Sequence, residues 1–153
     1  MIFAAVHDVL TMRIANWVSI AVVVLFAGTA LMAGVPMYVM LVHVGVGLGV
    51  LLATMVLFQL RLFGGGDAKL LAAASLWIGY PQLFPFLIWV TLIGGGLAVV
   101  MLAYRSVPAA AFPLPGWALR LHQPEEGIPY GVAISAGALV VYPMTTIPLL
   151  LGH

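Results

Sequence analysis

Three long stretches without a charged residue dominate the pattern of this chain. They extend from Ile14 to Leu60, from Leu70 to Tyr104, and from Gly127 to the C-terminus. A helix needs about 20 apolar residues to cross a bilayer, so the first stretch has room for two spans. Glycine next to proline is typical of a turn, and we therefore place the break between these two spans at Gly34-Val35-Pro36.

The second stretch leaves a choice between two helices and one. Gly79-Tyr80-Pro81 interrupts it, yet the segment from Asp67 to Gly79 is short for a full crossing at about 1.5 Å per helical residue. Either this segment is a helix partly sunk among its neighbours, or Leu70–Tyr104 is a single kinked span. We prefer two helices, because one crossing would place Arg105 and Arg120 on the opposite side from the other bases.

The composition agrees with membrane helices. Hydrophobic residues make up 65% of the 153 residues and charged residues only 6%, which is too little charge to cover a soluble domain. We therefore expect an all-α, polytopic integral membrane protein with about five to six membrane helices, including a shortened first one, in a single domain, 1-153. The last span is expected from about Ile128 to Leu150. All five bases then lie on one side, which the positive-inside rule makes cytoplasmic; they are Arg13, Arg61, Lys69, Arg105 and Arg120.

The stretch Arg61–Lys69 is a polar interruption that we expect to form a loop between two spans. Its glycines, Gly64-Gly65-Gly66, directly precede Asp67, and the topology brings Asp67 to the same membrane face as Asp8. Two neighbouring carboxylates cannot both ionise easily, so one pKa rises and the pair can share a proton. One can then take a proton from water while the other donates one, which is aspartic-protease chemistry. The glycines would let an extended substrate segment lie beside the acid.

Structural roles for these acids are open alternatives. Asp67 begins an Ala/Leu-rich segment and could serve as a helix N-cap, a contribution of about 1 kcal/mol. Asp8 could pair with Arg13 at the membrane edge. Acids inside a membrane are usually functional, but acids at its boundary are less often so.

Other features indicate packing rather than chemistry. His43 lies inside the second span and is interpreted as a histidine that hydrogen-bonds to a neighbouring helix. Gly45 and Gly49 form a GxxxG pattern, which is typical of close helix packing. The chain has no cysteine, which excludes a thiolate metal site and a cysteine nucleophile. We expect no metal and no cofactor.

Three segments of the chain, in the same order, resemble the type IV prepilin peptidases, a family of GxGD aspartic proteases. Gly64-Gly65-Gly66-Asp67-Ala68-Lys69 looks like the GxGD motif followed by x-Lys. Asp8 with Arg13-Ile14-Ala15-Asn16-Trp17 is similar to the first catalytic segment, with Ala15 where the family usually has proline. Gly127-Ile128-Pro129-Tyr130-Gly131 resembles the start of the last helix in the short CpaA/TadV-type branch, which serves Flp pili.

The resemblance implies that Asp8 and Asp67 are the catalytic aspartates of an intramembrane aspartic endopeptidase. Such an enzyme removes the basic leader peptide from Flp-type prepilins at the cytoplasmic face of the bacterial inner membrane. The expected partners are the prepilin substrate and the lipid bilayer, not nucleic acid, and a homo-oligomer is left open. The substrate-binding or loop part of the site would comprise Gly64, Gly65, Gly66 and Lys69, without a catalytic role for the lysine.

Two other classes of function compete with a peptidase. A small proton-coupled transporter could use Asp8, Asp67 and His43 as a relay, which would need acids deeper within the spans. In a noncatalytic membrane assembly subunit, the aspartates would only pair with nearby bases. Glu125 and Glu126 are hypothesised to contact a positively charged leader if the chain is a peptidase.

Overall fold

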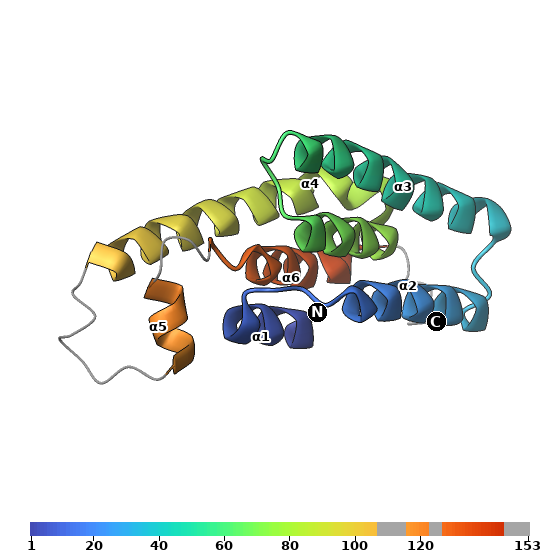
Figure 1. The fold of residues 1–153 in the computed structure, drawn as a ribbon. Coiled ribbons are helices and arrows are strands. Elements are labelled where there is room, and N and C mark those ends of the chain that lie inside the picture. Colours follow the sequence, from blue (N-terminus) through green and yellow to red (C-terminus); the bar gives the residue numbers. More distant parts are fainter. Residues whose placement is uncertain (107–115, 123–126, 146–153) are drawn as a thin grey trace.

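The computed structural model describes residues 1–106, 116–122 and 127–145, and within these ranges the chain is helical, with no strand. This confirms the all-α prediction. The elements in chain order are α1 (Ile2–Thr11), α2 (Asn16–Met32), α3 (Met37–Gln59), α4 (Gly65–Ser106), α5 (Gly116–His122), α6 (Tyr130–Val141) and the short 3-10 helix η3 (Tyr142–Met144); Figure 1 shows how the α-helices are arranged.

The break between the first two long helices lies where glycine and proline predicted it. α2 ends at Met32 and α3 begins at Met37, and Gly34 between them has a left-handed backbone with φ of 63°. Glycine adopts this conformation without steric strain. The turn therefore reverses the chain and places α3 beside the rest of the bundle (Figure 1).

Helix α4 consists of two arms, 65–78 and 80–106, because Gly79 has non-helical angles (φ 71°, ψ 176°). Figure 1 shows the second arm running back past the first. The preference for two helices over one kinked helix is thus confirmed. The first arm is the centre of the molecule: Ala68, Leu70, Ala74 and Ile78 are all at most 3% exposed, and α4 packs against α2, α3 and α6.

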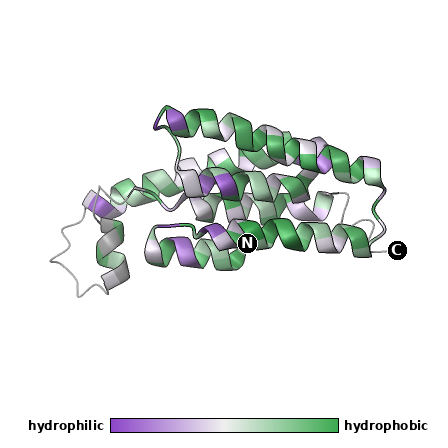
Figure 2. Cartoon of the chain, turned by 45° about the vertical axis from the view of Figure 1, so that its right-hand side comes forward, coloured by the Kyte–Doolittle hydropathy of each residue, from purple (hydrophilic) through white to green (hydrophobic). Residues whose placement is uncertain are grey.

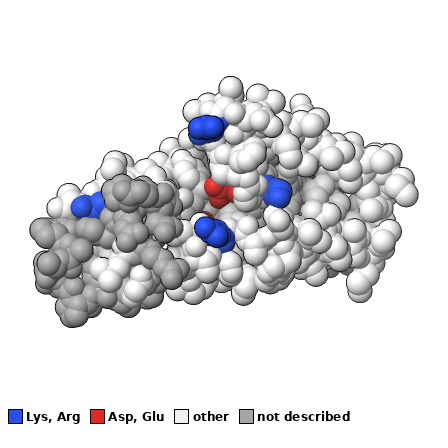
Figure 3. All heavy atoms as spheres, in the orientation of Figure 1, with Lys and Arg blue, Asp and Glu red and all other residues white. Residues whose placement is uncertain are grey.

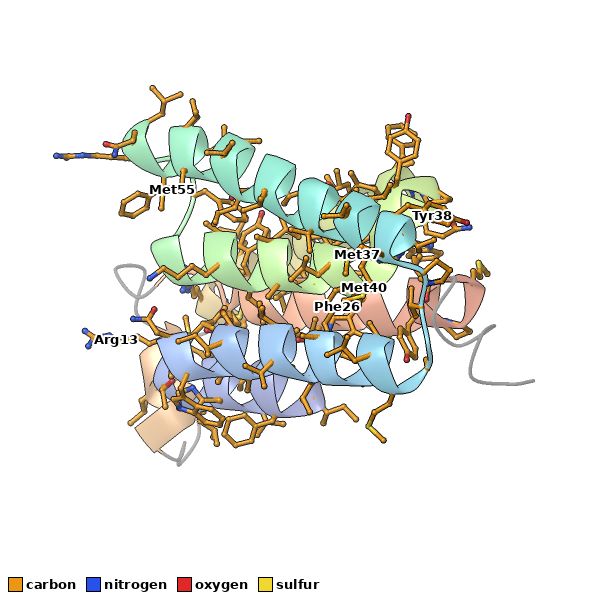
Figure 4. All side chains as sticks on the ribbon, turned by 90° about the vertical axis from the view of Figure 1, so that its right-hand side faces the viewer. Arg13, Phe26, Met37, Tyr38, Met40 and Met55 are labelled. Atoms are coloured by element: carbon orange, nitrogen blue, oxygen red, sulfur yellow. The ribbon has the colours of Figure 1, made fainter. Side chains whose placement is uncertain are left out.

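A buried histidine accounts for the corner at Gly79. In an unbroken helix the carbonyl of Leu76 would accept the amide hydrogen of residue 80, and the break removes that donor. His43 replaces it: its Nδ1 lies 2.6 Å from the Leu76 carbonyl oxygen, so the ring donates from Nδ1. The ring also stacks on Phe26, with centroids 5.7 Å apart, and Figure 4 shows Phe26 pointing into the bundle. The prediction that His43 hydrogen-bonds to a neighbouring helix is confirmed.

This corner predicts a large difference between two glycine-to-alanine changes. A Cβ at Gly79 would lie 2.6 Å from His43 Cε1 on a strained backbone, whereas a Cβ at Gly45 meets nothing within 4 Å. We expect Gly79→Ala to lower the free energy of unfolding by about 1–3 kcal/mol, through strain and loss of the buried hydrogen bond. Gly45→Ala should leave it nearly unchanged. Thermal unfolding of both variants in detergent measures this, and equal stabilities would contradict the role assigned to the corner.

The interpretation of Gly45 and Gly49 as the residues of a close helix contact is wrong, because a different glycine makes that contact. Gly47, between the two glycines of the pattern, is the residue at the close contact, since a Cβ there would lie 2.7 Å from Leu76 Cδ2 and 3.3 Å from the Ala72 carbonyl oxygen. Gly45 and Gly49 face open space within the described structure. The packing of α3 on the first arm of α4 therefore depends on one glycine rather than on a glycine pair.

Two predicted boundaries also differ from the structure. α4 begins at Gly65, so Gly65 to Lys69 are helical rather than part of a loop, because packing against neighbouring segments overrides the low helix propensity of glycine. The last helix is α6 (Tyr130–Val141), followed by η3, and is shorter than Ile128–Leu150. Residues 146–153, which complete the predicted span, lie outside the described ranges.

Within the described ranges, α3 and α4 are long and apolar enough to cross a membrane, judged by length and composition. α1, α2 and the segment Tyr130–Met144 are shorter apolar helices. Figure 2 shows hydrophobic residues along most of α2 and α3, and Met37 and Tyr38 at the start of α3 are exposed. These features fit a membrane protein, while the count of five to six spans stays a prediction.

Candidate active site

Asp8 and Asp67 line the same cavity, although they are 59 positions apart in the sequence. The cavity has a volume of about 410 Å³, and its lining residues are Asp8, Met12, Arg13, Ile14, Gly64, Gly66, Asp67, Gly127 and Ile128. The charge of Asp8 acts on the Asp67 carboxyl group. Figure 3 shows the acidic atoms at the surface in this view, with basic groups on three sides of them.

Asp8 accepts a hydrogen bond from the start of α6. It lies on α1 and is only 4% exposed, and the backbone N–H of Gly131 donates a hydrogen bond of 2.7 Å to its Oδ2. A side chain at position 131 has no room, because its Cβ would lie 2.7 Å from Asp8 Oδ2 and 3.0 Å from Ile14 Cδ1. The third sequence segment, Gly127–Gly131, thus contacts Asp8 directly. The sequence singled out this segment only as the start of a helix.

Asp67 lies in the first turn of α4, as the third residue of the helix. It is therefore not the N-cap, and the N-cap interpretation is wrong. Its carboxyl group folds over Gly64, so a Cβ on Gly64 would collide with Asp67 Oδ2. A side chain at position 64 would therefore displace the Asp67 carboxyl group.

The other two glycines of the run leave room for neighbouring parts of the same chain to pack against them. Gly66 faces Ile14, since a Cβ there would lie 3.1 Å from Ile14 Cβ and 3.3 Å from its carbonyl oxygen. Gly65 faces the ring of Phe58, at 3.2 Å from its Cε2. The glycine run was expected to let a substrate segment approach. In the structure, the connector between α1 and α2 occupies the space beside Gly66.

These contacts predict unequal effects of alanine along the run. Gly64→Ala should displace the Asp67 carboxyl group and, if Asp67 acts in catalysis, lower kcat/KM by about tenfold or more. Gly65→Ala is the matched control, because it meets only the edge of a flexible phenyl ring and should retain most activity. Cleavage rates normalised to folded protein test this. Equal losses in the two variants would mean that the run acts only through helix stability.

No basic side chain pairs with either aspartate in the part of the chain that the structure describes. Lys69 donates instead to Asn16 Oδ1 at 2.9 Å, which links α4 to the start of α2. Arg13 lines the cavity, but its side chain points outward from the bundle in Figure 4. The predicted alternative in which Asp8 pairs with Arg13 is not observed.

His43 is not part of this cavity. It contacts Gly79, which lies about 18 Å along the first arm of α4 from Asp67. Its ring also donates to the Leu76 carbonyl. A relay through all three groups would have to bridge that distance.

A second, larger cavity has no comparable chemistry. Its volume is about 480 Å³, and it lies between the start of α1 and parts of α2, α4 and α6. No carboxyl group, histidine or cysteine lines it. Among the described residues, no group of three or more histidine, cysteine, aspartate or glutamate side chains is arranged to hold a metal ion.

The family of the chain follows from its similarity to known proteins. The sequence model of the type IV leader peptidase family matches residues 1–99. The chain belongs to the type IV leader peptidase family. No curated protein and no solved structure matches the chain.

The match to the type IV leader peptidase family includes both aspartates and the glycine run, and it implies a peptidase, a hydrolase that acts on prepilins. It ends before α6, so the Gly131 contact rests on the structure alone. Glu125 and Glu126, which were hypothesised to contact the leader, lie outside the described residues, as does the side chain of Arg120.

Proposed function

We propose that the protein is an aspartic endopeptidase in which Asp8 and Asp67 together activate water. The observation that carries this proposal is the shared cavity of the two carboxyl groups, one from α1 and one from the first arm of α4. Two carboxyl groups in one partly buried site can share a proton, which gives the acid and the base that peptide hydrolysis needs.

The mechanism follows from that shared proton. The ionised carboxylate takes a proton from water as the water oxygen attacks the scissile carbonyl carbon, and the protonated carboxyl gives its proton to the carbonyl oxygen. In the resulting tetrahedral intermediate the C–N bond breaks. The first carboxyl group then donates the proton it received to the leaving nitrogen, and the second recovers a proton from the diol hydroxyl. Both groups return to their initial states, and one water is consumed.

The proposed substrate is an Flp-type prepilin, cleaved after its basic leader at the cytoplasmic face of the inner membrane. The bases near the cavity support this orientation: Arg13 lines it, Lys69 follows Asp67 on α4, and Arg105 donates to the carbonyl of Gly127, which also lines it. Positive charge is enriched on the cytoplasmic side of membrane proteins. The site would then face the compartment in which the leader is exposed.

The two competing functions have less support. A proton relay would need His43 near the acids, but its ring donates to the Leu76 carbonyl at the far end of the arm. A noncatalytic subunit would pair the aspartates with bases, whereas the described hydrogen bond of Asp8 comes from a backbone amide.

Reconstitution with a prepilin tests the proposal directly. Purified protein in liposomes should remove the leader at one position, identified by mass spectrometry of the new N-terminus. Cleavage should persist in the presence of EDTA, because the proposed chemistry uses no metal. Absence of cleavage across Flp-type prepilins, or complete inhibition by the chelator, would contradict the proposal.

A further inference from the structure

The N-terminus of α6 is capped by a residue from another helix. α6 begins at Tyr130 after Pro129 and has no side-chain cap of its own in the described structure. The amide of Gly131, in the first turn, instead donates to Oδ2 of Asp8 on α1. A backbone N–H bonded to a carboxyl oxygen favours the charged form of that group, and the partial positive charge of a helix N-terminus acts in the same direction.

Asp67 lacks such a hydrogen bond. It also lies at a helix N-terminus, in the first turn of α4, so the field of a helix end does not distinguish the two acids. No hydrogen bond to the Asp67 carboxyl group is present among the described residues. The direct bond from Gly131 is therefore a contact that Asp8 has and Asp67 lacks.

Arg105 fixes the segment that delivers this amide. At the end of α4, its Nη2 donates to the Gly127 carbonyl at 2.5 Å, and its Nε donates to the Leu121 carbonyl at the end of α5 at 2.9 Å. Gly127 has φ of 77° and, with Ile128, lines the cavity of the two aspartates. One guanidinium group thus ties the end of α5 and the entry of α6 to α4, four residues before Gly131.

We propose that Arg105, through the entry of α6, is a positioning residue that keeps the Gly131 amide on Asp8, so that Asp8 is the base of the pair and Asp67 the acid. Asp8 then takes the proton from water, and Asp67 gives its proton to the substrate carbonyl oxygen. This inference rests on the proposed function, because it divides the roles within the same pair.

The other groups that face Asp8 are the remaining candidates for determining which of the two aspartates ionises first. Burial of Asp8 opposes its ionisation, His7 on the same helix acts on Asp8 through its charge, and the charge of Asp8 in turn acts on Asp67 of α4. Arg13 lines the cavity from the connector, and α6 presents its backbone amide. α5 also contacts α1 and carries Arg120 and His122, whose side chains lie outside the described part.

The composition permits a direct test, because Asp8 and Asp67 are the two aspartates of the whole chain. Protein labelled with ¹³C at the aspartate carboxyl carbon gives two side-chain signals, which Asp8→Asn and Asp67→Asn assign. In the unaltered protein, Asp8 should ionise at lower pH than Asp67. If Asp67 ionises first, the division of roles is overturned, and this measurement needs no destabilising variant.

Variants at the end of α4 then test Arg105. In Arg105→Gln, Asp8 should ionise at higher pH and kcat should fall about tenfold, with KM nearly unchanged. Arg105→Lys keeps one charged donor group in place of the two donating nitrogens of the guanidinium, and it should recover part of the lost kcat. Tyr104→Phe is the control, because it removes the hydrogen bond to the Ala118 carbonyl of α5 but not the bond to Gly127.

Equal effects of Tyr104→Phe and Arg105→Gln, or an unchanged titration of Asp8 in Arg105→Gln, would overturn the role of Arg105. His7→Gln reports how much of the order comes from the neighbouring charge, and a reversal of the order in that variant would also overturn the proposal. Failure of the proposed function looks different, because both aspartate-to-asparagine variants would then cleave prepilin normally.

Discussion

Asp67→Asn is expected to lower the rate of leader cleavage by about a hundred- to ten-thousand-fold, because it removes one of the two groups that move protons in the reaction. Asparagine has nearly the same shape as aspartate and adds no bulk over Gly64, where the carboxyl group lies. The variant should insert and unfold like the original protein. Cleavage of a prepilin in liposomes, with thermal unfolding measured in parallel, separates activity from stability.

Asp8→Asn should have a loss of similar size. The amide keeps one oxygen, which can still accept the hydrogen bond from Gly131 at the start of α6, so the fold should survive. If either variant processes prepilin at the normal rate, the two-aspartate mechanism is wrong. If instead both variants lose stability and keep their activity per folded molecule, the aspartates have a structural role.

Gly131→Ala is expected to have the second largest effect, a loss of about tenfold to a hundredfold in kcat. The new Cβ would lie 2.7 Å from Asp8 Oδ2 and 3.1 Å from Asp8 Cβ, so the carboxyl group must shift. Displacement of a reacting group by about 1 Å can reduce catalysis by about a hundredfold. Steady-state cleavage rates at saturating and at low substrate concentration distinguish kcat from KM.

The same helix offers a matched control for this change. Gly137 also lies on α6 in a tight contact, where a Cβ would lie 2.9 Å from Val90 Cγ2, but it is not among the residues that line the cavity. Gly137→Ala should therefore reduce stability with little effect on the activity of the folded fraction. Similar activity losses in the two variants would show that crowding of α6, not the position of Asp8, controls the rate.

The sequence predicted the elements that depend on hydrophobic length and on local backbone chemistry. The turn at Gly34 and the interruption at Gly79 follow from glycine conformation and are confirmed. It could not predict that His43 replaces the missing donor at Leu76, because that contact joins helices 33 positions apart. The sequence pattern predicted only that the hydrogen-bond partner of His43 lies on a neighbouring helix.

The start of α4 shows that helix propensity alone does not predict where this helix begins. Three consecutive glycines predict a loop, yet Gly65 and Gly66 are helical because Phe58 and Ile14 pack against them. The register of the glycines in α3 was also wrong, since sequence spacing does not reveal which helix face meets a neighbour. At the site, the motif order gave both aspartates as candidates, and the structure places them at one cavity, but the contact between Gly131 and Asp8 is tertiary and left no local signal.

The first arm of α4, 65–78, has a consequence for the lipid around it. At about 1.5 Å per residue the arm is about 21 Å long, whereas the hydrocarbon core of a bilayer is about 30 Å thick. The Asp67 end and the Gly79 corner therefore do not both reach a headgroup layer of normal spacing. If the arm crosses a bilayer, thinner lipid beside it or water above the aspartates has to make up this mismatch of about 9 Å. In that arrangement water would reach a depth at which an unmodified membrane holds only acyl chains.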